Sequence, residues 1–134
     1  MIFIDTGAFV ARYIQRDQYH QDAVKGWRLL EERRLRCVTS PLILSEAITL
    51  LARRGGYAFA AQRGRALFSS EALTILRASQ EDEAAALDVM EKFADQAVSF
   101  TDGVSFVLMR THHLQEVFSF DRHFERAGFH LWNE

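Results

Sequence analysis

The sequence is poor in residues that break or cross-link a chain: its 134 residues include one proline and one cysteine. The lone Cys37 cannot form an internal disulfide, so the fold does not depend on an oxidising compartment. No apolar run approaches the ~20 residues that cross a bilayer. Asp5 interrupts the first apolar stretch before a signal-peptide core could develop. These absences lead us to expect a cytoplasmic protein with no membrane association.

Positive charge is not in excess either. Sixteen Lys and Arg residues face 18 Asp and Glu residues, giving a formal net charge of −2 and a pI near 6.2. A nucleic-acid partner would therefore need a local basic patch or bound cations. Apolar residues make up 49% of the chain, and no low-complexity segment or internal repeat is present. We expect one domain, residues 1–134, with a substantial core.

Short apolar runs alternate with longer amphipathic segments along the chain. The runs expected to form strands are IFI (2–4), LRCVT (35–39), LTILR (73–77), EVFSFD (116–121) and FHLW (129–132). The segments expected to form helices are 8–13, 21–34, 41–54, 57–68, 79–95 and 103–113. Alternation of this kind predicts an α/β fold, with a mainly parallel sheet of four or five strands and helices on both faces. Ligands bind such sheets at the carboxyl ends of the strands, where the strand order reverses.

Two of these helices carry clear end signals. The segment SPLILSEAITLLARRGG has Ser40 as its cap, Pro41 in its first turn and Gly55–Gly56 as its stop. The segment from Ser79 has Asp82 at capping-box spacing. Its expected inward-facing stripe is Leu87, Met90, Phe93 and Ala97.

Four carboxylates are placed to meet at one edge of the predicted sheet. Asp5 and Asp121 each follow an apolar run, and Asp102 opens a helix after VSFT. Glu46 lies beside the apolar stripe of its helix. Four acids that converge repel one another, and a divalent cation relieves this repulsion. Because all four ligands are oxygens, they indicate a hard ion such as Mg²⁺ or Mn²⁺.

Each acid alone also has a structural explanation. Asp5 and Asp121 suit turns that follow strands. Asp102 suits the positive end of a helix, with Thr101 as its cap. Glu46 could pair with Arg53, two turns later on the same helix. Only the set of four argues for a site.

Covalent phosphate chemistry is an alternative that this chain is poorly equipped to perform. Phosphatases of the haloacid-dehalogenase type carry a second aspartate two residues after the first, and here that position is Gly7. Receiver domains use a lysine late in the sheet, whereas Lys25 and Lys92 lie on predicted helices. The histidines show no spacing typical of zinc ligands. An aspartate-based phosphohydrolase is therefore the less favoured reading.

Four segments together resemble the PIN-domain ribonucleases, particularly the VapC toxins of toxin–antitoxin pairs. They are MIFIDTGAFVARY, SPLILSEAITLLAR, VSFTDGVSFVLM and EVFSFDRHFERAGF. The resemblance covers nearly the whole chain and implies an α/β/α sandwich whose metal-binding and catalytic acids are Asp5, Glu46, Asp102 and Asp121. It also implies supporting roles for Thr6 and Ser105. Two positions depart from the usual pattern: Gly7 stands where Ser or Asn is common, and Gly103 where Ala is common.

The function implied by this resemblance is Mg²⁺- or Mn²⁺-dependent endoribonuclease activity of a type II toxin. Its implied partners are tRNA or rRNA as substrate, a cognate antitoxin and a second copy of the chain. Arginines that could contact RNA phosphates are Arg12, Arg16, Arg53, Arg54 and Arg122. The alternative is an inactive PIN-fold module that binds RNA or protein, although such a degenerate copy is expected to lose an acid and here none is missing.

Overall fold

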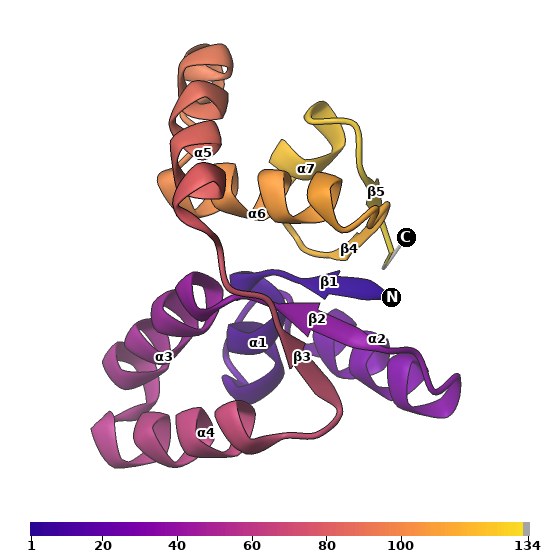
Figure 1. Cartoon of the computed structure of the whole chain (residues 1–134). Helices are drawn as coiled ribbons and strands as arrows, with labels where there is room; N and C mark the ends of the chain where they lie inside the picture. The colour runs from indigo at the N-terminus through magenta and orange to yellow at the C-terminus, as the bar shows by residue number, and fades with distance from the viewer. Residues whose placement is uncertain (133–134) are drawn as a thin grey trace.

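The computed structural model describes residues 1–132 and shows a three-layer α/β/α arrangement, as the sequence predicts (Figure 1). The five strands are β1 (Ile2–Ile4), β2 (Cys37–Thr39), β3 (Leu73–Ile75), β4 (Glu116–Phe118) and β5 (His130–Leu131). The helices are α1 (Thr6–Tyr13), α2 (His20–Glu32), α3 (Pro41–Gly55), α4 (Tyr57–Ser69), α5 (Gln80–Lys92), α6 (Phe100–Thr111) and α7 (His123–Arg126), with a 3₁₀ turn η1 (Ala94–Gln96). In Figure 1, α1–α4 lie on one side of the sheet and α5–α7 on the other.

All strand pairs are parallel, and the strand order is β3-β2-β1-β4-β5. The chain adds β2 and β3 on one side of β1 and then returns to add β4 on the other side. The order therefore reverses between β1 and β4, which makes the carboxyl ends of these two strands the expected ligand site. The backbone N–H of Asp5 extends their pairing by donating to the carbonyl oxygen of Phe118 at 3.1 Å.

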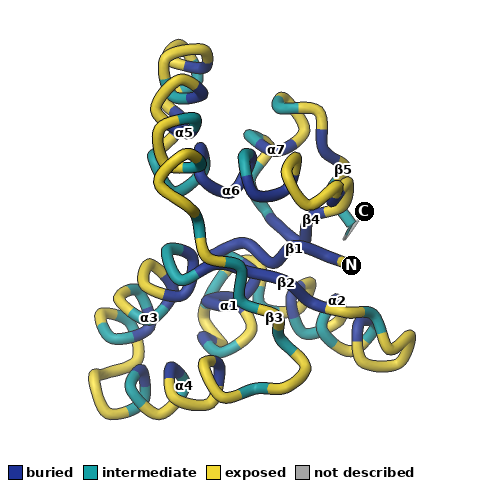
Figure 2. The backbone as a smooth tube through the Cα atoms, in the orientation of Figure 1, coloured by how far each residue is buried: buried dark blue, intermediate teal, exposed yellow. Residues whose placement is uncertain are grey.

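The central strands are continuously apolar because both of their faces are covered. Ile2, Phe3 and Ile4 of β1 are all buried, as is Val38 of β2 (Figure 2). Aromatic rings fill the two interfaces. Trp27 of α2 packs against Phe118 on one side, and Phe106 of α6 packs against Phe124 on the other. The result is a rigid sheet whose carboxyl edge holds the polar residues.

Helix α3 begins and ends where its sequence signals predict. The Ser40 side chain accepts a hydrogen bond from the N–H of Ile43 at 3.2 Å, and Pro41 occupies the first turn. Gly56 ends the helix with a φ of 98°, a conformation that favours glycine. These ends fix the register of Glu46 on α3.

The predicted inward stripe of α5 is wrong in phase. Ala86 and Val89 are buried with Phe93, whereas Leu87 is 55% exposed and Ala97 is also exposed. The reason is the close approach of α6: a Cβ added to Gly103 would lie 2.8 Å from the carbonyl oxygen of Ala86. Helix α5 therefore turns its small residues toward α6. The departure from the family pattern at Gly103 has this packing role.

Candidate active site

Asp5 is the buried centre of the candidate site. It directly follows β1 and is only 7% exposed. Burial, followed by the nearby charges of Asp102 and Asp121, raises the pKa of Asp5 to about 7. Hydrogen bonds from the Ser119 hydroxyl and the Thr6 backbone N–H oppose this rise. Near neutral pH, Asp5 is therefore poised between its protonated and charged forms.

The loop after β4 joins Asp121 to Asp5 through Ser119. The Ser119 hydroxyl donates to Asp5 Oδ2 at 2.8 Å and accepts from the backbone N–H of Asp121 at 2.9 Å. Asp121 Oδ1 in turn accepts from the backbone N–H of His123 at 2.9 Å. Asp121 lies three residues beyond β4 rather than at its end, because the strand stops at Phe118. Ser119 thus fixes the two acids relative to each other.

Asp102 is oriented by a capping box at the start of α6. The Ser99 side chain accepts from the N–H of Asp102, and Asp102 Oδ2 accepts from the N–H of Ser99, both at 3.1 Å. The sequence-based start of this helix at residue 103 and its Thr101 cap are both wrong. The helix begins at Phe100, and Ser99 is its cap. The same contacts explain why Asp102 has one fixed orientation.

Glu46 reaches the same group of acids from α3. Its pKa is raised by partial burial and then by the charges of Asp102 and Asp121. Hydrogen bonding to the side chains of Thr6 and Thr101 lowers it in part. Among residues 1–132, no ion pair joins Glu46 to Arg53. The structure thus places Glu46 beside the other acids, apart from the arginine that the structural explanation requires.

The donor atoms of this edge fit a divalent cation. Asp102, Asp121 and His123 each offer one atom, and these atoms lie within 4.8 Å of one another. Two polar atoms here are buried without a hydrogen-bond partner, Thr6 Oγ1 and His123 Nδ1. Buried polar groups are rarely left unsatisfied, and the convergent carboxylates carry a repulsion that a cation relieves. The donor set is therefore chemically suited to an ion.

The remaining sequence-predicted residues are not all brought to this edge. Ser105 is buried, and its hydroxyl donates to the Thr101 carbonyl oxygen at 2.9 Å. Arg54 pairs with Asp17 at 2.6 Å. Arg16 donates to the backbone carbonyl of Arg54. These contacts give Ser105 and Arg54 local structural roles.

The other arginines differ in position. Arg12 lies 4.5 Å from the ring centroid of Trp27 and lines a cavity beside Cys37. Cys37 starts β2, so Arg12 sits at the edge of the sheet opposite the acids. Arg53 is exposed on α3, and Arg122 pairs with Glu125 next to Asp121. The position of Arg12 argues against the predicted role in holding RNA at the acids.

Sequence reasoning missed three polar residues of this edge, namely Ser99, Ser119 and His123. Ser99 stands at capping-box spacing before Asp102, the same signal that was recognised at Ser79 and Asp82. Ser119 and His123 stand two residues before and after Asp121. Their proximity to Asp5 and Asp102 arises only from the conformation of the loop after β4.

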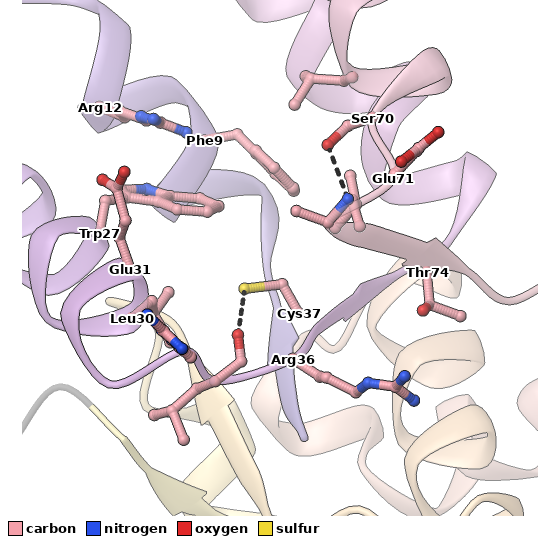
Figure 3. A pocket seen from close by; sticks show the side chains of 15 residues that line it. Phe9, Arg12, Trp27, Leu30, Glu31, Arg36, Cys37, Ser70, Glu71 and Thr74 are labelled. Carbon is pink, nitrogen blue, oxygen red and sulfur yellow. Dashed lines mark hydrogen bonds between the residues drawn. The ribbon is translucent and has the colours of Figure 1, made fainter.

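The cavity that Arg12 lines has a volume of about 600 Å³ and is distinct from the acidic site. Figure 3 shows Trp27 and Ser70 on opposite sides of Cys37. The Cys37 thiol is buried, as expected, and burial raises its pKa. None of the four acids lines this cavity. The chemistry of the molecule therefore centres on the carboxyl edge of the sheet.

A PIN domain family model matches residues 2–130, and the chain therefore belongs to the PIN-domain family. The chain is 31% identical over 129 residues to the 23S rRNA-specific endonuclease VapC20 of Mycobacterium tuberculosis, a match covering 96% of this chain and 95% of that protein. The crystal structure of VapC20, described as a sarcin–ricin loop cleaving toxin, matches with a TM-score of 0.86 and 30% identity over 96% of both chains. These findings confirm the resemblance to VapC-type toxins and the predicted fold.

Proposed function

We propose that this chain is a divalent-metal-dependent endoribonuclease and the toxin of a type II toxin–antitoxin system. One observation carries the proposal: Asp5, Glu46, Asp102 and Asp121 converge at the carboxyl edge of a PIN fold, between β1 and β4. The homologue VapC20 is a 23S rRNA-specific endonuclease. This similarity supports ribosomal RNA as the substrate class.

The four acids would hold Mg²⁺ or Mn²⁺, with Asp5 and Asp102 as direct ligands. When bound, such an ion lowers the pKa of a water molecule and offsets the charge that develops on the phosphate. Ser119 holds Asp5 Oδ2, and the Ser99 backbone N–H holds Asp102 Oδ2. The two carboxylates are therefore oriented before a cation arrives, which reduces the entropic cost of binding.

Glu46 is the acid best suited to accept a proton from the attacking water. It is more exposed than Asp5, and its raised pKa makes it a stronger base than an ordinary glutamate. The hydroxyls of Thr6 and Thr101 would orient its carboxylate. Asp121 would then complete the ligand set through the loop that Ser119 fixes.

A cleavage assay tests the proposal directly. The purified, antitoxin-free chain is incubated with ribosomes and with total RNA in the presence of Mg²⁺ or Mn²⁺, and the new 5′ ends are mapped. We expect cleavage at discrete sites that EDTA and Asp5→Asn both abolish. Cleavage that persists in both Asp5→Asn and Asp102→Asn would show that this site is not responsible.

The proposal also includes a cytoplasmic location, a cognate antitoxin and a homodimer. In residues 1–132, no helix is both long enough and apolar enough to span a bilayer. The apolar side chains of Tyr57, Phe68 and Leu87 are exposed and could be covered by a protein partner. Expression of the wild-type chain should arrest bacterial growth, and Asp5→Asn should not. Light scattering on the purified chain would give its oligomeric state.

A further inference from the structure

His123 directs a ring nitrogen at two of the site acids. Its Nδ1 atom lies 3.1 Å from Asp121 Oδ1 and 3.6 Å from Asp102 Oδ2. The side chain is 23% exposed, but Nδ1 itself is buried. The backbone N–H of His123 already donates to Asp121 Oδ1, which anchors the residue beside that carboxylate.

This nitrogen has no hydrogen bond that explains its position. Despite the 3.1 Å separation, Nδ1 and Asp121 Oδ1 do not meet the geometry of a hydrogen bond, and Nδ1 has no other partner within the described chain. By contrast, Nδ1 of His20 lies 2.7 Å from the carbonyl oxygen of Ala11. A buried nitrogen left unsatisfied carries a free-energy cost of about 1–3 kcal/mol, and that cost is removed if the nitrogen binds something that also binds the two acids.

The spacing of the three donors suits one shared cation. Adjacent ligands of an octahedral ion bound at about 2.1 Å lie roughly 3 Å apart. The two separations of 3.1 and 3.6 Å are close to this value. Thr6 Oγ1 supplies a second, independent sign that the cluster receives a ligand, because it belongs to a residue only 6% exposed and has no partner.

We propose that His123 Nδ1 is a direct metal ligand, together with Asp102 and Asp121. The inference rests on the proposed function and deepens it, because it changes the expected metal preference. Mg²⁺ is bound almost entirely by oxygen atoms, whereas imidazole nitrogen suits first-row transition ions. A nitrogen in the ligand set therefore shifts the preference of the site from Mg²⁺ toward Mn²⁺ and the later ions.

Spectroscopy of bound Mn²⁺ tests this ligand without relying on activity. Mn²⁺ alone is added to the full-length wild-type chain and to His123→Gln, and electron spin-echo modulation is recorded for each. The matched control is His112→Gln, since His112 is exposed at the far end of α6 from Asp102. We expect nitrogen coupling in the wild type and in His112→Gln, and its loss in His123→Gln.

Calorimetric titration of the same proteins gives the metal preference. We expect His123→Gln to weaken Mn²⁺ binding on the order of 10-fold or more, and to weaken Mg²⁺ binding by no more than about 3-fold. Equal losses for both ions would overturn the inference. So would Mn²⁺ bound to the wild type without nitrogen coupling, a result that needs no variant to fold. An absence of any Mn²⁺ binding would instead contradict the proposed function.

Discussion

Ser119 and Asp5 share a buried hydrogen bond across the gap between β4 and β1, with Oγ and Oδ2 2.8 Å apart. This bond stabilises the charged form of Asp5 and so lowers its pKa against the effect of burial. The same hydroxyl accepts from the N–H of Asp121. One small side chain thus controls both the position and the ionisation of the acids.

Ser119→Ala should therefore move metal binding to higher pH. Without the hydroxyl, the pKa of Asp5 rises above about 7, and a cation must displace a proton over a wider pH range. A hydrogen bond to a charged group contributes about 1.5–3 kcal/mol, so we expect the acid limb of Mn²⁺ binding to shift upward by about one pH unit. Calorimetry from pH 5 to 8 measures the limb. Ser69→Ala, whose hydroxyl bonds only to carbonyls of α4, should leave it unchanged.

Asp5→Asn should stabilise the metal-free protein at high pH. The pKa of Asp5 is about 7 in the folded state, above its ordinary 3.8, so the carboxyl favours folding less as pH rises from about 4 to 7. Three pKa units correspond to at most ~4 kcal/mol at pH 8. Asn avoids this cost and can still accept the Ser119 hydrogen bond. Urea unfolding in EDTA should show a larger gain at pH 8 than at pH 5, whereas an equal gain at both pH values would contradict the assignment.

The glycines at the two positions that depart from the family pattern should respond to alanine in opposite directions. In Gly103→Ala the new Cβ would lie 2.8 Å from the Ala86 carbonyl oxygen, so we expect a loss of about 1–3 kcal/mol of unfolding free energy. In Gly7→Ala the nearest atom is Phe120 Cδ2 at 3.8 Å, an ordinary contact. There the higher helix propensity of alanine should add about 0.5–1 kcal/mol. Thermal unfolding of both variants tests the pair, and destabilisation of similar size in each would contradict the packing argument.

Arg53 and Arg12 should differ in their effect on RNA binding. Arg53 is exposed on the helix that carries Glu46, whereas Arg12 lies over Trp27 at the opposite edge of the sheet. In an Asp5→Asn background, which prevents cleavage, Arg53→Ala should weaken binding and reduce the salt dependence by about 0.7 per lost phosphate contact. Arg12→Ala should leave both unchanged. Filter binding at several salt concentrations distinguishes these outcomes, and the reverse result would place the RNA at the other edge.

The sequence predicted the scaffold well wherever local chemistry decides the structure. Ser40, Pro41 and the glycine pair define α3, and β1 leads directly into Asp5. The phase of α5 could not be predicted, because the close approach of Gly103 makes a small residue, Ala86, more suitable than Leu87 for burial.

The acids of the site were found because each adjoins a recognisable strand or helix. Their partners Ser119 and His123 were not found, since they lie in a loop and a short helix whose conformation depends on contacts far away in the sequence. Ser119 meets Asp5 across 114 residues of chain. Such contacts follow from the strand order, which places β4 beside β1.

The claim on which this account depends is that the four acids share a divalent cation. Calorimetric titration of Mn²⁺ into the wild-type chain and into Asp5→Asn, Glu46→Gln, Asp102→Asn and Asp121→Asn tests it most directly. We expect saturable binding by the wild type and a loss of on the order of 10-fold or more in affinity for Asp5→Asn and Asp102→Asn. Wild-type binding that all four substitutions leave unchanged would contradict the account.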